Sequence, residues 1–339
     1  MSNQRVLVVT DPHHLGHVPP EGHPEHPASP ARVGAVRAAV DRTTGIEIAA
    51  GRAAERHELE RVHEAAHIAR IQAMSEAGGG WIDADTYVSS GTYDAACFAA
   101  GAGLVAIEML LADPSLSAAF VVTRPPGHHA TAGDGGGFCI FNNIAVAAAQ
   151  LLSQGARVVI VDWDAHHGNG TQDIFWDERN VLYFSIHQEM VYPGSGLPHE
   201  RGPAPENLTT VNLPLPAGAT GDHYLTLLDD IATPLVRSFE PHWVLVSCGF
   251  DAHLDDPLAE MALGADDFGL FASRAQSWAP QPGRTVLFLE GGYHLGALEA
   301  STAAVLRALT GREGPSPSPT TGGPGATRVS ELQRLWGPT

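Results

Sequence analysis

The amino-acid sequence predicts an α/β protein in which helices cover both faces of a mainly parallel sheet, for two reasons. Short, nearly continuous apolar runs rich in β-branched residues recur along the chain, as is typical of strands buried on both faces. Helix-like stretches separate these runs, which favours a doubly wound topology. The expected strands span residues 5–10, 118–123, 157–161, 181–187, 242–247 and 285–290. The expected helices span residues 32–40, 90–111, 142–153, 222–238, 265–278 and 296–309.

The end of the chain differs in composition from the rest. Residues 1–312 are expected to form one domain, followed by a Pro/Gly-rich tail over residues 313–339. The abundance of Pro, Gly, Ser and Thr in residues 314–327 is typical of a linker or of a tail bound to the surface. Residues 329–336 predict a short terminal helix that docks on the domain or on a partner, and such a helix could pair two chains into a homo-oligomer.

Composition narrows the classes of partner. Hydrophobic residues make up 44% of the chain, which supports a sizeable core, and the formal net charge is −19. This charge argues against nucleic acid and membrane partners and favours cationic ligands, although acidity can also serve solubility alone. Three cysteines give no disulfide framework. The apolar run near the N-terminus is too short for a signal peptide, and no stretch approaches a membrane-spanning length, so we expect a cytoplasmic protein.

Polar side chains follow four of the expected strands. Ligands of open α/β sheets bind beyond the carboxyl ends of strands, so these loops are the first place to look for a site. The loops are Arg124-Pro-Pro-Gly-His128-His129, Asp162-Trp-Asp164-Ala-His166-His167-Gly-Asn169-Gly, Cys248-Gly-Phe-Asp251-Ala-His253 and Gly291-Gly-Tyr293. Their common position at strand ends predicts that they meet at one edge of the sheet.

The second and third loops carry a candidate metal site. Asp164 and His166 stand two residues apart at a strand end, so both side chains are expected on the same side, and Asp251 can supply a third ligand. Three protein ligands leave one position open for water, which is the arrangement of catalytic zinc. A buried polar pair near a helix N-terminus is the alternative for an isolated Asp-x-His. All four loops stand at the carboxyl ends of expected strands, and this shared position favours the metal site over the buried polar pair.

The first and fourth loops carry candidate catalytic groups. His128 and His129 follow two prolines and a glycine, and adjacent histidines in a stiff loop suit acid–base chemistry on metal-bound water. Surface histidines are the alternative. Tyr293 follows two glycines and can donate a hydrogen bond to a developing oxyanion, or can simply be a packed aromatic in a turn.

These loops resemble those of the histone deacetylase family, in particular its class II-like branch with the bacterial histone-deacetylase-like amidohydrolases and acetylpolyamine amidohydrolases. Six motifs occur in the order of that family, between about His13 and Leu309. They are Arg124-Pro-Pro-Gly-His-His, Gly137-Phe-Cys-Ile-Phe-Asn-Asn, Asp162-Trp-Asp-Ala-His-His-Gly-Asn-Gly-Thr-Gln, Tyr192-Pro-Gly-Ser-Gly, Gly249-Phe-Asp-Ala-His and Glu290-Gly-Gly-Tyr. The resemblance implies the three-layer arginase/deacetylase fold, with a mainly parallel sheet of about eight strands flanked by helices.

The resemblance also implies a role for each site residue. Zn²⁺ is expected on Asp164, His166 and Asp251. His129 is the implied general base and then acid. His128 is its electrostatic partner, held by Asp162. Asn169 holds His129 in the class II pattern, and as a neutral partner it should leave His129 less easily protonated than an aspartate would. Tyr293 polarises the scissile carbonyl together with zinc.

The remaining implied residues surround the substrate and a second ion. Phe138 and Tyr192 are the expected aromatic walls of an acyl-lysine tunnel, with the backbone of Gly137 near the substrate. Leu258 stands where a polyamine-selective relative carries a gatekeeper glutamate, so that route to polyamine specificity is absent. A structural K⁺ is expected beneath the site on mainly backbone oxygens of Asp162, Asp164, His166, Ser185 and Ile186.

The sequence departs from the family at its N-terminal motif, His-Pro-Glu-x-Pro-x-Arg. His23-Pro-Glu25 has the glutamate but the wrong spacing to Arg32, and the stretch from His26 to Arg32 has the spacing but alanine at position 28. Arg32 is still a candidate for the arginine of the product channel. Other candidates are Asp83 or Asp85 as a rim carboxylate, with a solvated loop as the alternative, and a histidine-rich rim loop or second metal site formed by His13, His14, His17, His23 and His26. Cys139 is expected in the core.

The sequence therefore predicts a zinc-dependent amide hydrolase that acts on linear C–N bonds other than peptide bonds, removing acetyl or other acyl groups from lysine side chains or small amines such as polyamines. An enzyme restricted to acetylpolyamines or small amides is the first alternative. A di-manganese ureohydrolase is a remote one, because Gly168 follows His167 and His253 stands where that chemistry needs a bridging carboxylate. An inactive homologue that binds acylated ligands is the last.

Overall fold

The computed structural model describes residues 4–19, 26–203, 208–311 and 318–336, and in these the expected α/β fold is confirmed. Eight strands form one parallel sheet in the order β2-β1-β5-β10-β9-β6-β7-β8. The strands are β1 (Arg5–Thr10), β2 (Ile46–Ala50), β5 (Leu116–Val122), β6 (Val158–Asp162), β7 (Val181–Gln188), β8 (Thr210–Leu215), β9 (Trp243–Cys248) and β10 (Thr285–Leu289). A small antiparallel pair, β3 (Gly79–Trp81) and β4 (Tyr87–Ser89), lies apart from it.

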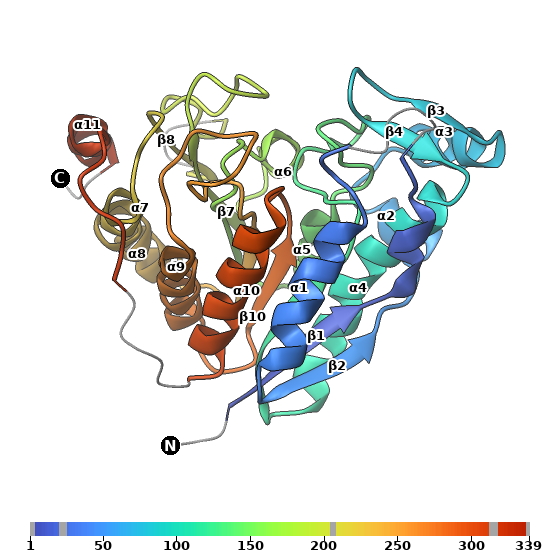
Figure 1. The fold of residues 1–339 in the computed structure, drawn as a ribbon, viewed down its shortest axis with the longest axis horizontal. Coiled ribbons are helices and arrows are strands. Elements are labelled where there is room, and N and C mark those ends of the chain that lie inside the picture. The colour runs from blue at the N-terminus through green and yellow to red at the C-terminus, as the bar shows by residue number, and fades with distance from the viewer. Residues whose placement is uncertain (1–3, 20–25, 204–207, 312–317, 337–339) are drawn as a thin grey trace.

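The helices complete a three-layer arrangement (Figure 1). They are η1 (Pro12–Gly16), α1 (Ala31–Arg42), α2 (Arg56–Leu59), α3 (Ala65–Glu76), α4 (Thr92–Ala112), α5 (Asn143–Leu152), α6 (Asn169–Ile174), α7 (Gly221–Leu227), η2 (Leu228–Ala232), α8 (Thr233–Phe239), α9 (Ala265–Trp278), α10 (Leu295–Leu309) and α11 (Ala326–Trp336). Helices α1, α10 and α9 lie side by side over one face of the sheet, and α4 and α5 cover the other.

Side chains along each strand point alternately to the two faces of the sheet, and they form two apolar clusters, one on each face. In β1, Val6 and Val8 belong to the cluster under α1 and α10, whereas Leu7 and Val9 belong to the cluster under α4 and α5. Successive side chains of a strand point to opposite faces, so a run without polar residues is what a doubly covered strand requires. This requirement is what made the central strands predictable from sequence.

The two strands of the large sheet that the sequence did not predict are its edges, β2 and β8. Strand β2 carries Glu47 among its apolar residues, and its side chains are only partly buried. Strand β8 contains Asn212 and Pro214, and proline within a run argues against a central strand. An edge strand tolerates both residues because one side of its backbone needs no ladder partner.

The single helix expected over residues 222–238 is instead two helices joined by a π-turn. Helix α7 ends at Leu227, η2 follows as a π-helix, and α8 begins at Thr233 with Pro234 in its first turn. Proline lacks the N–H that would continue the α-helical ladder and clashes with the preceding turn. The Thr233 hydroxyl donates instead to Leu228 O at 2.9 Å, so the wider turn absorbs the disruption.

Helix α4 is long and apolar enough, by length and composition, to cross a membrane, which the sequence analysis did not expect. Its most apolar window has a mean hydropathy of 2.0, yet 67% of that window is buried inside the protein. The helix packs against α5 and the sheet. A helix that is apolar all round is the expected form of an element enclosed on most sides by protein.

The described part of the tail, residues 318–336, lies against the domain. Thr320 donates from its backbone N–H (3.0 Å) and its hydroxyl (2.7 Å) to Asp267, and it accepts from Gly221 N at 2.7 Å. Helix α11 then packs against α7 and β8 and buries Val329 and Leu332 in the core. The expected boundary between residues 312 and 313 lies outside the described residues.

His63, between α2 and α3, is a buried histidine held in its neutral form. Its Nδ1 atom lies 2.9 Å from Thr131 O, which can only accept, and its Nε2 atom lies 2.9 Å from Asn142 N, which can only donate. Burial, aided by the neighbouring His67, lowers the pKa of His63 to about 4. The ring thus links Thr131, in the loop after His129, to Asn142, the residue just before α5. Protonation of His63 breaks the bond to Asn142 N, because a protonated Nε2 can no longer accept a hydrogen bond.

We predict that this group makes the fold sensitive to mild acid. The unfolded chain takes up the proton near pH 6.5 and the folded chain only near pH 4, so the contribution is present above pH 6.5 and is lost as pH falls toward 4. Between pH 7.5 and 5, His63 should account for a loss of about 2 kcal/mol in the free energy of unfolding. Urea unfolding of wild type and His63→Gln at both pH values measures it.

The glutamine variant should show a smaller loss over this pH interval, whatever its stability at pH 7.5. Equal pH dependence in wild type and His63→Gln would contradict the prediction.

Candidate functional site

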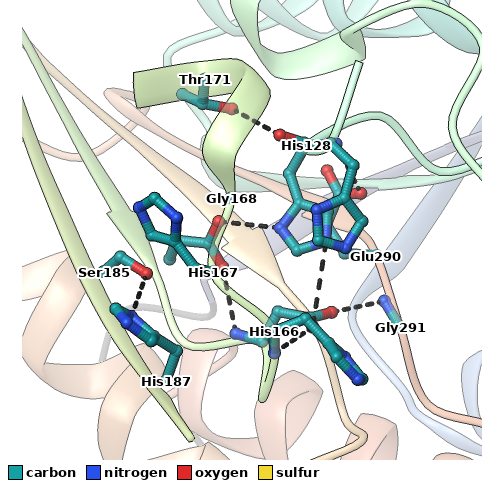
Figure 2. Close-up of polar contacts among 12 residues, drawn as sticks. His128, His166, His167, Gly168, Thr171, Ser185, His187, Glu290 and Gly291 are labelled. Atoms are coloured by element: carbon teal, nitrogen blue, oxygen red, sulfur yellow. Dashed lines mark hydrogen bonds and ion pairs between the residues drawn. The ribbon is translucent and has the colours of Figure 1, made fainter. Parts of the chain in front are cut away.

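The four loops singled out in the sequence follow strands β5, β6, β9 and β10, which are neighbours in the sheet in the order β5-β10-β9-β6. Because the strands are parallel, their carboxyl ends meet at one edge and the loops converge there. Figure 2 shows His128 and the consecutive residues Glu290 and Gly291 approaching His166 from two separate loops. The structure therefore brings the predicted residues together.

Asp164, His166 and Asp251 form a compact group whose ligand atoms all lie within 4.8 Å of one another. His166 Nδ1 lies 2.9 Å from Asp251 Oδ2 and 3.2 Å from Asp164 Oδ1. The expected reason for this proximity was wrong, because β6 already ends at Asp162. The residues lie in a turn, in which Asp164 N donates to Asp162 Oδ1 (3.1 Å) and His166 N donates to Asp164 Oδ1 (2.9 Å).

The two carboxylates of this group are buried and close to each other. Burial, together with the charge of Asp164, raises the pKa of Asp251 to about 7. Two further backbone donors hold them, with Gly291 N 2.7 Å from Asp164 Oδ2 and Ala165 N 2.7 Å from Asp251 Oδ1. A Cβ atom on Gly291 would overlap the Asp251 carboxylate, so the close approach needs glycine. Two carboxylates and an imidazole in this arrangement fit a divalent cation, whose charge offsets their repulsion.

The two histidines have different partners. His128 Nδ1 lies 2.9 Å from Asp162 Oδ2, and His129 Nδ1 lies 2.8 Å from Asn169 Oδ1. Burial opposes the charged form of His128, but Asp162 and Asp164 together raise its pKa to about 10. Burial, followed by the charges of His128 and His166, holds the pKa of His129 well below its usual value. His128 is thus the protonated member and His129 the neutral one, with Nδ1 donating to the amide and Nε2 free to accept a proton.

Aromatic rings line the approach to these histidines. The ring of Tyr192 stands perpendicular to His129 with centroids 4.9 Å apart, and Phe138 meets Tyr293 edge-on at 5.7 Å. Gly137 has φ +53° and lies against the rings of both His129 and Tyr192, where a Cβ would come within 2.8 Å of the tyrosine. Phe138 itself has φ +67° and donates its backbone N–H to Thr86 Oγ1 at 3.0 Å.

Tyr293 is positioned by groups on two other elements. Its backbone N–H donates to Asp256 Oδ2 at 2.7 Å, and the guanidinium of Arg32 lies 4.9 Å from its ring centroid. Arg32 is buried and donates to Gly292 O at 2.6 Å and to Glu290 O. Helix α1 therefore carries this arginine to the site even though the N-terminal motif is split.

The N-terminal histidines have varied surroundings. His17 is buried, lies 2.7 Å from Thr92 Oγ1 and stacks on Tyr87 at 4.3 Å. His26 meets Phe138 edge-on at 4.9 Å, so this histidine reaches the aromatic wall. His13 stacks on Phe98 and contacts Asp11, and His14 Nδ1 lies 2.5 Å from Asp11 O. His23 lies outside the described residues.

Other predicted residues lie around this centre. Ser185 is paired with Asp162 across β7 and β6, Ile186 follows in the same buried strand, and Cys139 is buried as expected. Leu258 is 38% exposed and shares a cavity wall with Met190. On the rim, Asp83 Oδ1 accepts from Asp85 N at 3.0 Å and from Thr86 N at 2.6 Å. These bonds fix the Asp83 side chain beside Thr86, whose hydroxyl accepts the backbone hydrogen bond of Phe138.

Two supporting carboxylates were missed as site residues. Glu290 is buried and its Oε2 accepts from Gly127 N (2.8 Å) and His128 N (3.2 Å), so it fixes the histidine loop. Burial raises its pKa to about 7. Asp256 holds Tyr293 as described above. A carboxylate that ends an apolar strand was a signal for Glu290, because a buried charge needs partners. Nothing in the sequence pattern distinguished Asp256 from its neighbour Asp255.

Comparison with known proteins agrees with this geometry. Residues 26–309 match the histone deacetylase domain. A probable deacetylase of Archaeoglobus fulgidus is 41% identical over 246 residues, covering 71% of this chain and 68% of that protein. A histone deacetylase-like amidohydrolase of Pseudomonas aeruginosa is 35% identical over 86% of this chain and 77% of its own. The crystal structure of the HDA15 HD domain superimposes with a TM-score of 0.89 at 30% identity, covering 98% of this chain and 94% of that one. The loops, the sheet that gathers them and these likenesses together show that the chain belongs to the histone deacetylase family of deacetylases and amidohydrolases.

Proposed function

We propose that this protein is a zinc-dependent amide hydrolase that removes acetyl or related acyl groups from the amine of a lysine side chain or of a small molecule. The observation that carries the proposal is the buried group Asp164, His166 and Asp251, which lies next to a neutral histidine and an aromatic passage. Two carboxylates and one imidazole form a donor set that zinc accepts with a position to spare. When bound, zinc supplies Lewis acidity for the scissile carbonyl and for the attacking water.

The histidine pair divides the proton chemistry. His129 Nε2 accepts a proton from the attacking water, since Asn169 occupies its Nδ1 side and its pKa is held low. His128 keeps its positive charge beside Asp162, which stabilises negative charge that develops near the two rings. The proton held on His129 then passes to the leaving amine. Asn169 cannot ionise, so it orients His129 without adding a charge.

The remaining residues bind the substrate. The hydroxyl of Tyr293 donates a hydrogen bond to the carbonyl oxygen, and Phe138 and Tyr192 contact the aliphatic chain that leads to the amide. Leu258 leaves the rim without the carboxylate that would select a polyamine. A K⁺ ion on backbone oxygens of residues 162, 164, 166, 185 and 186 belongs to the proposal and stabilises the turn that carries the zinc ligands.

Removing one ligand should abolish metal binding. Asp251→Asn takes away the charge that holds the ion and should weaken zinc affinity by more than about 100-fold, since even residues that only orient ligands cost about 10–100-fold. Elemental analysis should give one zinc per wild-type chain and far less in the variant. Asp255→Asn, which changes a half-exposed carboxylate of the same loop, should retain zinc. Two manganese ions per chain would instead point to the ureohydrolase alternative.

Removing the hydroxyl of Tyr293 should slow the chemical step and leave the metal in place. On the scale of a lost oxyanion donor, Tyr293→Phe should reduce kcat by about 10²–10³-fold. The zinc content should equal that of wild type, because the ring does not belong to the ligand group. Steady-state kinetics with an acetyl-lysine peptide, alongside elemental analysis, provide both values, and an unchanged kcat would remove Tyr293 from the mechanism.

A substrate panel tests the activity itself. Acetyl-lysine peptides, acetylpolyamines and amides with longer acyl chains should be compared by kcat/KM. We expect hydrolysis of acetylated amines without a strong preference for polyamines, because Leu258 replaces the selecting carboxylate. An enzyme that binds these compounds but hydrolyses none would support the inactive homologue, and turnover of acetylpolyamines alone would support the narrower amidohydrolase.

A further inference from the structure

Helix α11 lies beyond the residues that match the histone deacetylase domain, which end at 309, yet it contacts the loop that carries Tyr192. We define the Tyr192 loop as residues 189–201, which follow β7. Both ends of this loop touch α11. Arg328 forms an ion pair with Glu189 at the start of the loop, and the guanidinium of Arg201 at its end lies 4.2 Å from the ring centroid of Trp336.

The helix is itself well anchored, so it can act as a fixed support. Val329, Leu332 and Trp336 are buried in the core, and Gln333 Nε2 donates to Asp230 Oδ2 at 2.7 Å. The segment before the helix is tied to α9 through the two bonds from Thr320 to Asp267. A helix packed along an apolar face moves little relative to its core, in contrast to an exposed loop.

The Tyr192 loop borders a cavity, so part of it is not packed against the domain. A cavity of about 390 Å³ lies against it, with His167, His187, Met190, Tyr192 and Arg328 among its lining residues. Met190 is 96% exposed and has φ +64°, a left-handed conformation that is unfavourable for a residue with a side chain. Strained conformations persist only where surrounding contacts impose them.

Hydrogen bonds connect residues within the loop, so contacts at the two ends of the loop influence the position of Tyr192 near its centre. Within the loop, Glu200 accepts from Gly196 N at 3.2 Å and from Leu197 N at 3.1 Å. Ser195 Oγ also lies 2.8 Å from Nδ1 of His167, which lies outside the loop. The stretch from Gly196 to Glu200 is therefore a connected unit. Tyr192 lies between this unit and Glu189, with its ring against His129.

We propose that α11 is a positioning element for substrate binding, in which Arg328 and Trp336 hold the Tyr192 loop and thereby keep the Tyr192 ring at the wall of the tunnel. This inference rests on the proposed function only in assigning Tyr192 to the tunnel. Tyr192 contacts the chain of the substrate rather than the reacting carbonyl, so it binds ground state and transition state alike. Loosening the loop therefore raises KM and leaves kcat nearly unchanged.

The test uses variants of the full-length protein on an acetyl-lysine peptide. Arg328→Ala and Arg201→Ala each remove one attachment and should raise KM about 3-fold, and the double variant about 10-fold, as expected for exposed ion pairs and cation–π contacts. Arg328→Lys keeps the charge and should return KM to within about 2-fold of wild type. Ser330→Ala is the matched control, since the exposed Ser330 hydroxyl donates to Ala326 O within the same helix and its removal should leave KM unchanged.

Two further measurements test whether Arg328 affects KM through the Tyr192 loop. In a Tyr192→Ala background, Arg328→Ala should have no additional effect on KM, because the residue through which it acts is gone. An equal effect in both backgrounds would overturn the proposal. Hydrogen exchange followed by mass spectrometry should be faster over residues 189–201 in Arg328→Ala than in wild type or Ser330→Ala.

Hydrogen exchange does not require a turnover assay, so it separates the two proposals. If wild type hydrolyses no acyl amide, the proposed function fails while the exchange rates still test the support of the loop. If exchange over residues 189–201 is the same in Arg328→Ala and wild type, α11 does not hold the loop, whatever the enzyme hydrolyses.

Discussion

The organisation of this protein depends on two buried carboxylates, Asp164 and Asp251, brought together at one nitrogen of the His166 imidazole. Water would solvate them far better than the protein interior does, so their burial is unfavourable unless positive charge lies between them. The surrounding chain is built to hold them there. Backbone N–H groups of Ala165 and Gly291 bind the outward oxygens, and the glycine at 291 leaves room for both groups.

The neighbouring residues extend the same electrostatic design. Asp162 lies next to this pair and holds His128 in its charged form, which in turn helps to keep His129 neutral. Glu290 supports the histidine loop from the far side through two backbone bonds. Because each group sets the charge state of the next, a change at one position affects the whole cluster. Such coupling explains why the motif residues lie in four loops but act as one unit.

The sequence predicted the inner strands and the residues at their ends better than the edge strands and the supporting contacts. The inner strands were predictable because burial on both faces demands continuous apolar runs. The candidate metal-ligating residues and the two histidines were predictable because they stand at the ends of those strands. Strands β2 and β8 were not, since Glu47, Asn212 and Pro214 are acceptable only at an edge, and edges are defined by tertiary structure. The break at η2 and the roles of Asp256 and Arg328 likewise depend on contacts between residues far apart in the chain.

Within the described residues, strand β8 has one hydrogen-bonded neighbour, β7, yet all six residues of β8 are buried. Helix α11 is among the elements that pack against it. An uncovered strand at this border would offer its unpaired N–H and C=O groups as a template for another chain. Helix α11 covers part of β8, so the packing of this helix helps to keep the border of the sheet from pairing with another chain.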